Sequence, residues 1–464
     1  MALPSGMRTL VLAAVAAVLT SVGAVVVVVH HDEGPRRIAG DAVPELVWSL
    51  DASTTYGQPG AEFRSPVGGT EYDFGSAGFI DAGATMVTVL GIADDGMSLR
   101  DPVMYGIDAD TGVTRWHAPA AELGGCASIP VHGVLVCFTS SWAETPALIG
   151  YDIADGTVTR TPVDWPVFAL AADEEQVYVA EGDVESDDVR VHAGTLGDPD
   201  AHWTRMFAMG TAWEDLSGEI LDVAHGQGVL TLGADVAGFD LATGEPTWTT
   251  ELTGCSSLTG TSGALVVRLH AECGGPPGTA AADILDGAGR ILATTDDGIV
   301  HDLMLDRAAD ETIPVLLGDT AYDRRDGTVR WTNPDLVRRL PDGNGGVGAS
   351  GTATAVLGDT ALLHDSATGA LTGLDLRTGR ELWRKSIPYF GSALAWDGDI
   401  AVFSDSIGLC AIDPGTGEIV WAAPFDAAAA DSVGITGEGE FTVRNNGRYV
   451  YASARTMNGL TSPV

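Results

Sequence analysis

Five stretches of the chain repeat one short pattern, in which an Asp is followed by Gly four residues later and by Trp four residues after that. LDLRTGRELW (374–383) is one of them. An Asp side chain accepts hydrogen bonds from backbone amides two residues further on and so opens a turn, and Gly adopts the positive φ that a hairpin position requires. The pattern therefore predicts repeated strand–turn–strand units. Its intact copies are Asp108/Gly112/Trp116, Asp240/Gly244/Trp248, Asp323/Gly327/Trp331, Asp375/Gly379/Trp383 and Asp413/Gly417/Trp421.

Two further copies of the pattern are degenerate. Asp152/Gly156 is followed by Arg160 where Trp is expected, and Asp283/Gly287 is followed by Ile291. The long gap between the copies at 152 and 240 has room for one more unit, of which Trp203 is the expected remnant. A Trp ring at a fixed offset is able to wedge between neighbouring sheets. Periods of about 40–50 residues built from short strands are typical of a β-propeller.

The repeat resembles the PQQ-type repeat, A-x-D-x-x-T-G-x-x-x-W, of quinoprotein-like propellers, and CAIDPGTGEIVW (410–421) agrees with it at every position. This resemblance implies that the repeat residues are structural, that the Trp residues dock one blade against the next and that an N-terminal strand completes the last blade. PELVWSLD (44–51) fits that strand, with Trp48 at the docking position and EFTVRNNGRYVYAS (440–453) as its two partner strands. The units and this composite number one more than an eight-bladed ring requires. We expect an all-β propeller of eight four-stranded blades, with seven or another count left open.

The resemblance also raises the question of a quinone cofactor. Quinoprotein alcohol dehydrogenases hold calcium in the central channel through Glu, Asn and Asp, and they cover the cofactor with a disulfide between adjacent cysteines. This chain has no Cys-Cys pair, and the calcium ligands have no counterparts that we can place on it. We therefore expect no catalytic, cofactor-binding or metal-binding residues and no cofactor. A PQQ-dependent oxidoreductase, or a propeller that binds a small ligand in its channel, remains the alternative.

Four of the five cysteines form two similar pairs. Cys126 and Cys255 each follow a repeat Trp, and each is followed by a second Cys, Cys137 or Cys273, on or just past the next apolar strand. The spacing predicts two disulfides at equivalent places in two repeats, which indicates an oxidising compartment. Four buried free thiols are the alternative. Cys410, in the apolar run GLCAID, is predicted to be a buried thiol.

The N-terminal region differs from the rest of the chain. Residues 9–29 form a run of 21 residues without a charge, and a helix needs about 20 to cross a bilayer. A poor cleavage site follows, so we expect an uncleaved signal anchor, with a cleaved signal peptide as the alternative. HHDE (30–33) is interpreted as a polar membrane boundary and not as a metal site. The expected organisation is a short cytoplasmic N-terminus (1–8), the membrane segment (9–29), a linker (30–44), the propeller (45–455) and a C-terminal tail (456–464).

The charge balance bears on the choice of partner. Acidic side chains outnumber basic ones by 64 to 24, and nucleic acid is excluded as a partner because binding a polyanion requires a basic footprint. We expect a single-pass protein of the cell membrane whose extracytoplasmic propeller binds an unidentified protein partner as a scaffold, without catalysis. The closest functional resemblance is to the BamB-like lipoproteins, which are scaffolds in outer-membrane assembly. This chain departs from them because no Cys precedes Cys126 to carry a lipid.

Overall fold

The computed structural model describes most of the chain beyond its N-terminal region. The described residues are 44–70, 77–94, 98–140, 143–183, 188–209, 220–261, 264–271, 273, 281–296, 298–341, 347–387, 391–404, 408–424, 439–443 and 448–461. The predicted membrane segment, 9–29, and the HHDE stretch, 30–33, lie outside them. Within the described ranges, no helix has the length and apolar character to cross a membrane.

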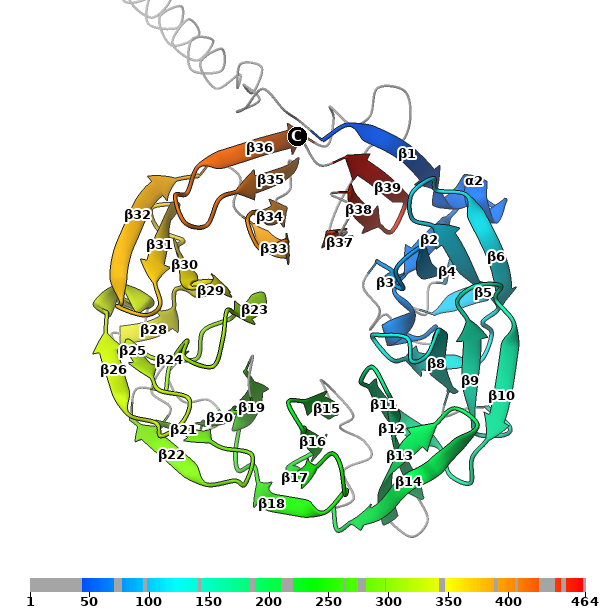
Figure 1. The fold of residues 1–464 in the computed structure, drawn as a ribbon, viewed down its shortest axis with the longest axis horizontal. Coiled ribbons are helices and arrows are strands. Elements are labelled where there is room, and N and C mark those ends of the chain that lie inside the picture. Colours follow the sequence, from blue (N-terminus) through cyan, green and yellow to red (C-terminus); the bar gives the residue numbers. More distant parts are fainter. Residues whose placement is uncertain are drawn as a thin grey trace, which may run out of the picture. The chain divides into compact units, whose positions relative to one another are not determined.

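Short antiparallel sheets follow one another around a ring, and the chain fills them in sequence order (Figure 1). Nine of the sheets in the described part of the chain are blades of a β-propeller, so the expectation of eight is wrong. The reason is that the degenerate repeats keep their turn and their apolar strands. A missing Trp removes a contact between sheets, but it does not prevent the sheet itself from forming.

The first five blades are regular four-stranded sheets, except that a short strand joins the first. Blade 1 is β2 (Ala61–Arg64), β4 (Thr85–Ala93), β5 (Leu99–Asp108) and β6 (Thr114–Pro119), with β3 (Ile80–Asp81) beside β4. Blade 2 is β7 (Leu123–Cys126), β8 (Val134–Thr139), β9 (Ala147–Asp152) and β10 (Val158–Pro162). Blade 3 is β11 (Val167–Ala172), β12 (Val177–Asp183), β13 (Asp188–Thr195) and β14 (Asp198–Phe207). Blade 4 is β15 (Leu221–Ala224), β16 (Gln227–Leu232), β17 (Asp235–Asp240) and β18 (Pro246–Glu251), and blade 5 is β19 (Ser257–Gly260), β20 (Val266–His270), β21 (Ala281–Leu285) and β22 (Ile291–Thr295).

The remaining blades include the irregular part of the ring. Blade 6 is β24 (Val315–Leu317), β25 (Thr320–Tyr322) and β26 (Val329–Thr332), and blade 7 is β29 (Ala353–Gly358), β30 (Thr360–Asp365), β31 (Ala370–Asp375) and β32 (Arg380–Ser386), joined by β23 (Leu305–Ala308). Blade 8 is β33 (Ser392–Trp396), β34 (Ala401–Ser404), β35 (Gly408–Ile412) and β36 (Ile419–Pro424). Blade 9 is β37 (Gly439–Val443), β38 (Arg448–Ser453), β39 (Thr456–Thr461) and β1 (Leu46–Asp51). Outside the blades lie the hairpin of β27 (Val337–Pro341) and β28 (Val347–Gly351) and the short helices α2 (Ala52–Tyr56), η1 (Pro66–Gly68) and η3 (Pro334–Leu336).

Strands from both ends of the propeller close the ring in blade 9. β1 pairs with β39 in antiparallel register, with Trp48 opposite Gly459. Residues 456–461, which the sequence assigns to a C-terminal tail, therefore form the strand next to β1. The N–H of Thr461 also donates to the Glu45 carbonyl over 2.9 Å. The N-terminal strand thus pairs with 456–461 and shares its sheet with three strands, instead of pairing with the expected 440–453.

The apolar core is divided among the contacts between blades. Eight hydrophobic clusters of the described residues each combine side chains from two adjacent blades. The contact between two adjacent blades is called a joint here and is named by the two blades, so joint 7/8 lies between blades 7 and 8. Burial of apolar area at each joint is what holds the sheets side by side.

Candidate functional site

The repeat Trp residues lie on the outer strands of seven blades, each against the next blade. At five joints the indole Nε1 donates to a backbone carbonyl of the following blade. These bonds run from Trp48 to Ala109 (3.2 Å), Trp116 to Ile153 (2.9 Å), Trp203 to Leu241 (2.9 Å), Trp331 to Leu376 (2.9 Å) and Trp383 to Pro414 (2.7 Å). Trp248 lies over Gly289 of blade 5, and Trp421 packs on Tyr449 of blade 9 with 5.9 Å between ring centroids.

The Gly of five repeats contacts the Trp of the preceding blade, which differs from the grouping in the sequence pattern. The pattern joins each Gly to the Trp four residues later, but in the structure the two belong to different joints. Gly112, for example, lies at joint 9/1, whereas Trp116 lies at joint 1/2. The contacts run from Trp48 to Gly112, Trp116 to Gly156, Trp203 to Gly244, Trp331 to Gly379 and Trp383 to Gly417.

This arrangement explains why a degenerate repeat keeps its Gly. Gly156 has no Trp four residues later, yet it still receives the ring of Trp116 from blade 1. A Cβ at Gly156 would approach that ring to 2.6 Å, and the φ of +74° also favours Gly. The same two requirements apply to Gly112, Gly244 and Gly379, whose φ values are +71°, +70° and +69°. The Gly thus serves the turn and the joint together, whereas the sequence pattern indicates only the turn.

Each of these rings occupies a slot whose walls have almost no side chain. On the next blade the wall is the Gly of the Asp-Gly turn, as for Trp383 over Gly417. On its own blade the wall is the residue directly across the ladder, as for Gly373 opposite Trp383. A Cβ at either Gly would clash with the indole ring. Sequence reasoning missed these cross-strand partners, although a small residue two positions before the Asp marks them: Gly106, Gly238, Ala321, Gly373 and Ala411.

The Asp residues of the pattern act as turn formers. Asp108, for example, accepts from the N–H of Thr111 over 2.8 Å and from the guanidinium of Arg115. Burial alone would raise the pKa of Asp108, but the bonds from Arg115 and Thr111 lower it to about 2. The turns at Asp152, Asp240, Asp323, Asp375 and Asp413 are closed in the same way as that at Asp108, by a bond from the Gly N–H four residues on to the Asp carbonyl.

The expected turn of blade 5 lies elsewhere. The turn is formed by Asp286 and Gly289, not by Asp283 and Gly287, because it is one residue shorter than the others. Asp283 instead lies within the sheet, where it accepts from Arg268 (2.6 Å) and from His270 Nε2 (2.7 Å). Burial opposes ionisation there, but these bonds keep the pKa of Asp283 below its usual value.

Two joints have no Trp, and each is filled differently. At joint 2/3, Arg160 turns back to Glu122 and Thr145 of its own blade. Leu196 of blade 3 takes the slot instead and lies directly on Gly150. At joint 5/6, Gly327 of blade 6 approaches the backbone of Leu292 so closely that a Cβ would clash with its carbonyl.

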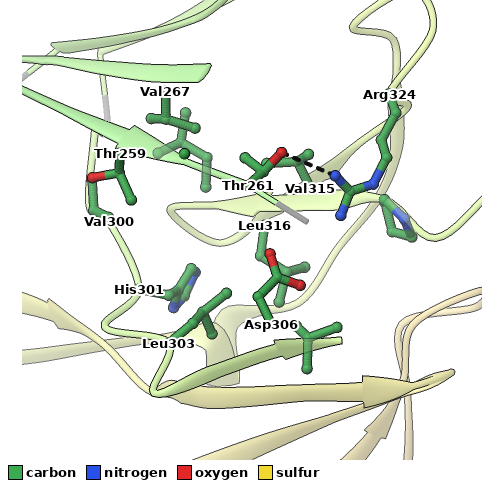
Figure 2. A pocket seen from close by; sticks show the side chains of 14 residues that line it. Thr259, Thr261, Val267, Val300, His301, Leu303, Asp306, Val315, Leu316 and Arg324 are labelled. Atoms are coloured by element: carbon green, nitrogen blue, oxygen red, sulfur yellow. Dashed lines mark hydrogen bonds between the residues drawn. The ribbon is translucent and has the colours of Figure 1, made fainter. Parts of the chain in front are cut away.

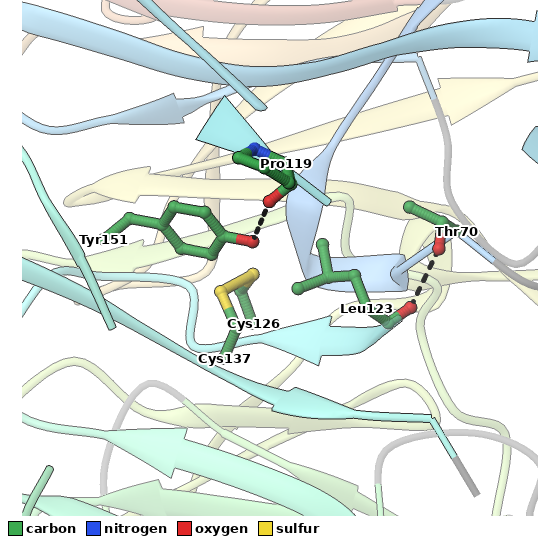
Figure 3. Close-up of a disulfide and its surroundings, with 6 residues drawn as sticks. All are labelled: Thr70, Pro119, Leu123, Cys126, Cys137 and Tyr151. Atoms are coloured by element: carbon green, nitrogen blue, oxygen red, sulfur yellow. Dashed lines mark hydrogen bonds between the residues drawn. A yellow bond between two sulfur atoms is a disulfide. The ribbon is translucent and has the colours of Figure 1, made fainter. Parts of the chain in front are cut away.

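Both predicted disulfides are present, and they lie in the two blades that lack a docking Trp. Cys126–Cys137 connects paired residues of β7 and β8 and is buried. Figure 3 shows it beside Tyr151, whose hydroxyl donates to the Pro119 carbonyl over 2.8 Å. Cys255–Cys273 joins residues just before β19 and just after β20, and both are exposed. The first disulfide is next to the hairpin turn and the second is at the open end of its hairpin, so the two places are not equivalent. Cys410 is buried and lies outside both disulfides, as expected.

A cleft opens beside blade 6, between blade 5 and blade 7 (Figure 2). It is narrow beside β24 and wider at its mouth, along Thr259, Gly260 and the segment 300–306. One wall is β19, whose Ser257, Thr259 and Gly260 are exposed although β19 is the innermost strand of its sheet. The opposite wall is the segment 300–306, and β24 lies at the base.

His301 links two blades at the cleft, and hydrogen bonds engage both of its ring nitrogens. Its Nε2 donates to the Gly318 carbonyl over 3.0 Å, and its Nδ1 accepts from the N–H of Ala353 over 3.3 Å. Burial lowers the pKa of His301 to about 4, so the imidazole is neutral at physiological pH. The ring therefore connects blade 6 to blade 7 with both nitrogens in use.

Arg324, a charged side chain of the cleft, is also held in place by hydrogen bonds. Arg324 donates from Nε to the Ile313 carbonyl (2.7 Å) and from Nη1 to Thr261 Oγ1 (3.2 Å), the bond drawn in Figure 2. Burial lowers the pKa of Arg324, and the nearby carboxylates of Asp306 and Glu311 oppose that shift. The cleft thus presents backbone edges and fixed polar groups, an arrangement suited to binding.

A second group of charged residues lies in blade 3, where Glu181 and His192 are buried and Asp200 is exposed. Glu181 Oε2 accepts from Arg190 (2.8 Å) and lies 3.2 Å from His192 Nε2, while His192 Nδ1 lies 2.5 Å from Asp200. Burial disfavours the imidazolium, but the two carboxylates outweigh it and raise the pKa of His192. Among the described residues, no group of three or more His, Cys, Asp or Glu side chains is arranged to hold a metal ion.

Comparison with known proteins locates a family resemblance in one part of the ring. No curated protein matches the chain. Similar solved structures include BamB from Moraxella catarrhalis (13% identity, TM-score 0.37, 90% of this chain and 98% of that chain) and a europium-containing methanol dehydrogenase (10%, 0.42, 90% and 93%). Another is the quinohemoprotein alcohol dehydrogenase ADHIIG from Pseudomonas putida HK5 (12%, 0.44, 92% and 77%). Residues 307–393, from β23 to the start of β33, match the family described as outer membrane protein assembly factor BamB.

Proposed function

We propose that this propeller is a protein-binding or scaffolding module without catalytic activity, attached to the cell membrane through residues 9–29 and located on the extracytoplasmic side. The observation that carries the proposal is the cleft beside blade 6. Its His and Arg side chains already have structural partners, whereas the edge of β19 is exposed. An exposed strand edge recognises polypeptide through main-chain hydrogen bonds.

The family match supports the same proposal. The matching segment, 307–393, contains β24 at the base of the cleft, whereas the two walls of the cleft lie outside it. The family is described by a role in assembling proteins, and an assembly factor acts through protein partners. The two disulfides support the extracytoplasmic location, because disulfides persist in oxidising compartments.

Site-specific photo-crosslinking in intact cells tests protein binding. A photoreactive residue in place of Thr259, which is exposed on β19 and lines the cleft, is expected to give a discrete protein adduct. The matched control carries the same residue in place of Thr249, exposed on the outer strand of blade 4. Identical adducts at both positions, or none at Thr259, would contradict a partner in the cleft.

Two further measurements address the alternatives. Titration of the full chain with pyrroloquinoline quinone and calcium is expected to give no heat, and tight stoichiometric binding would establish the quinoprotein alternative instead. Treatment of intact cells with an impermeant thiol reagent after mild reduction is expected to label Cys255 and Cys273. Labelling that requires cell lysis would contradict the extracytoplasmic location.

A further inference from the structure

The face of blade 3 that packs on blade 2 carries two buried ionisable side chains. Val179 of β12 packs with Val136 and Leu148 of blade 2. His192 is directly opposite Val179 in the ladder of β12 and β13, and Glu181 is two residues beyond Val179 on the same strand. Residues in these positions share one face of a sheet. Glu181 and His192 therefore belong to joint 2/3, which has no docked Trp among the described residues.

The imidazole of His192 is enclosed between two carboxylates. Its side chain is 3% exposed, with Nε2 3.2 Å from Glu181 Oε2 and Nδ1 2.5 Å from Asp200 Oδ1. Both ring nitrogens face carboxylate oxygens, which only accept hydrogen bonds, so the arrangement fits an imidazolium with a proton on each nitrogen. Burial opposes this charge, but the two carboxylates raise the pKa of His192 above its usual value. The protonated ring is thus the form that this cluster stabilises.

The other charged groups of the cluster keep their charge when His192 loses its proton. Arg190, two residues before His192, donates to Glu181 over 2.8 Å and lies 3.4 Å from Asp164, in the segment that precedes β11. A guanidinium stays charged over the physiological pH range, so Glu181 always retains one cation. The hydrophobic cluster of the joint consists of Val131, Val136, Leu148, Val167, Val177 and Val179. A change in the charge of His192 therefore acts mainly on its contact with Asp200.

Asp200 lies in an irregular part of blade 3. The ladder of β13 and β14 shifts its register there, so that residues 199–202 of β14 oppose Gly194 alone. The extra residues of such a bulge are left unpaired. The carboxylate of Asp200 connects the bulge to the rest of the sheet, because it contacts His192 of β13 and accepts from Thr204 Oγ1. The position of the bulge thus depends on this one side chain.

The bulge is continuous with the turn that fills joint 2/3. Leu196 lies between the end of β13 and the start of β14, four residues before Asp200. Its side chain packs on Gly150 of blade 2, in the slot that a Trp occupies at other joints. A displacement of the bulge therefore reaches the residue that connects blade 3 to blade 2.

A neutral His192 has another hydrogen-bond partner at hand. Release of the Nδ1 proton to solvent leaves Nδ1 as an acceptor, while the proton on Nε2 maintains the contact with Glu181. Nδ1 is 3.1 Å from Thr204 Oγ1, whose hydroxyl can then donate to the ring instead of to Asp200. Asp200 loses both donors in this exchange. Because Asp200 is exposed, its carboxylate can turn to water.

We propose that joint 2/3 is pH-sensitive: a proton on His192 holds Asp200 and the bulge 199–202 against β13, and release of that proton frees them together with Leu196. A group whose pKa is raised by folding stabilises the folded state fully below its unfolded pKa, about 6.5 for His. This stabilisation is lost as the pH rises through the titration of His192. The joint is therefore fixed in acid and loosens toward alkaline pH, independently of any partner in the cleft beside blade 6.

Hydrogen exchange of the full chain, followed by mass spectrometry, tests the proposal. The exchange rates are converted to protection factors, which correct for the intrinsic dependence of exchange on pH. Between about pH 6 and about pH 9, we expect the protection of residues 196–204 to fall about tenfold, as for the loss of one charge-assisted hydrogen bond. The protection of residues 240–246, the corresponding turn of blade 4, should stay constant.

Three variants identify the group that titrates. His192→Gln and Asp200→Asn are each expected to remove most of the change with pH, because neither retains the ion pair. His202→Gln, at an exposed His of the same bulge, should retain the full response. Asp200 is exposed, so Asp200→Asn provides the test even if His192→Gln fails to fold. Constant protection of residues 196–204 in the unmodified protein, an undiminished response in Asp200→Asn, or loss of the response in His202→Gln would overturn the proposal.

Discussion

Blades 2 and 5 differ from the other seven blades of the described ring in two respects. Neither has a Trp on its outer strand, and each contains a disulfide. A docked Trp buries its large ring between two sheets and so fastens one blade to the next. A disulfide within a blade restricts the unfolded chain of that blade only. Blades 2 and 5 are thus stabilised internally by a disulfide, while the joint from each of them to the following blade is weaker than a joint that contains a docked Trp.

The cleft lies at one of these weaker joints. Joint 5/6 has no Trp, and its blade 6 lacks an inner strand among the described residues. Binding sites are drawn from the less stable parts of a structure, where segments can adapt to a partner. The location of the cleft therefore agrees with a recognition role for this side of the ring, while the Trp joints act as the rigid frame.

The largest expected effect is the loss of a docked Trp. Trp383 is buried at joint 7/8 and donates to Pro414. Trp383→Ala leaves a cavity between two sheets, and we expect the free energy of unfolding to fall by about 3–5 kcal/mol. Chemical denaturation measures it. Leu382→Ala, at the exposed neighbour on the same strand, is the control, with an expected change below about 0.5 kcal/mol. Equal effects would mean that the Trp slot does not fasten the blades.

Removal of a disulfide is expected to have the next largest effect. The Cys126→Ala, Cys137→Ala double variant loses a cross-link that closes a loop with a sequence separation of 11, and we expect a loss of about 3 kcal/mol. Alkylation during stepwise reduction distinguishes the two disulfides. Cys255 and Cys273 are exposed and should react first, while the buried pair reacts only as the protein unfolds. The reverse order would contradict the difference in burial.

Acid should weaken the side of the ring with the cleft. His301 is neutral in the folded protein because burial lowers its pKa to about 4, whereas in the unfolded chain it binds a proton below about pH 6.5. The unfolded chain therefore binds a proton that the folded protein does not bind between about pH 6.5 and 4. As the pH falls through this range, the free energy of unfolding decreases by about 3 kcal/mol in total. His301→Gln should reduce this fall, measured as the pH dependence of unfolding. The same substitution at exposed His225 should leave it unchanged.

The repeat predicts much of the fold but little of the cleft. Asp and Gly at fixed spacing determine the local turn, so the positions of most blades follow from the sequence. The spacing misplaces the turn of blade 5 because Asp283 and Gly287 satisfy it, although the shorter turn uses Asp286 and Gly289. The three-stranded form of blade 6 was beyond sequence reasoning, because the pairing of β23 with β29 depends on tertiary contacts between two blades. The contact between a turn Gly and a Trp also joins two blades, so the spacing does not reveal which Trp lies against each turn Gly.

The smallest expected effect tests whether joint 2/3 is weaker than the joints that contain a docked Trp. Leu196 fills the slot over Gly150 that a Trp would occupy at other joints, and it is partly buried. Because a partly buried Leu contributes less apolar area than a docked Trp, Leu196→Ala should lower the free energy of unfolding by about 1–2 kcal/mol. Chemical denaturation under the conditions used for Trp383→Ala gives the comparison directly. A loss as large as that of Trp383→Ala would show that Leu196 stabilises joint 2/3 as much as a Trp stabilises joint 7/8. The association between a disulfide within a blade and a weaker joint would then fail for blade 2.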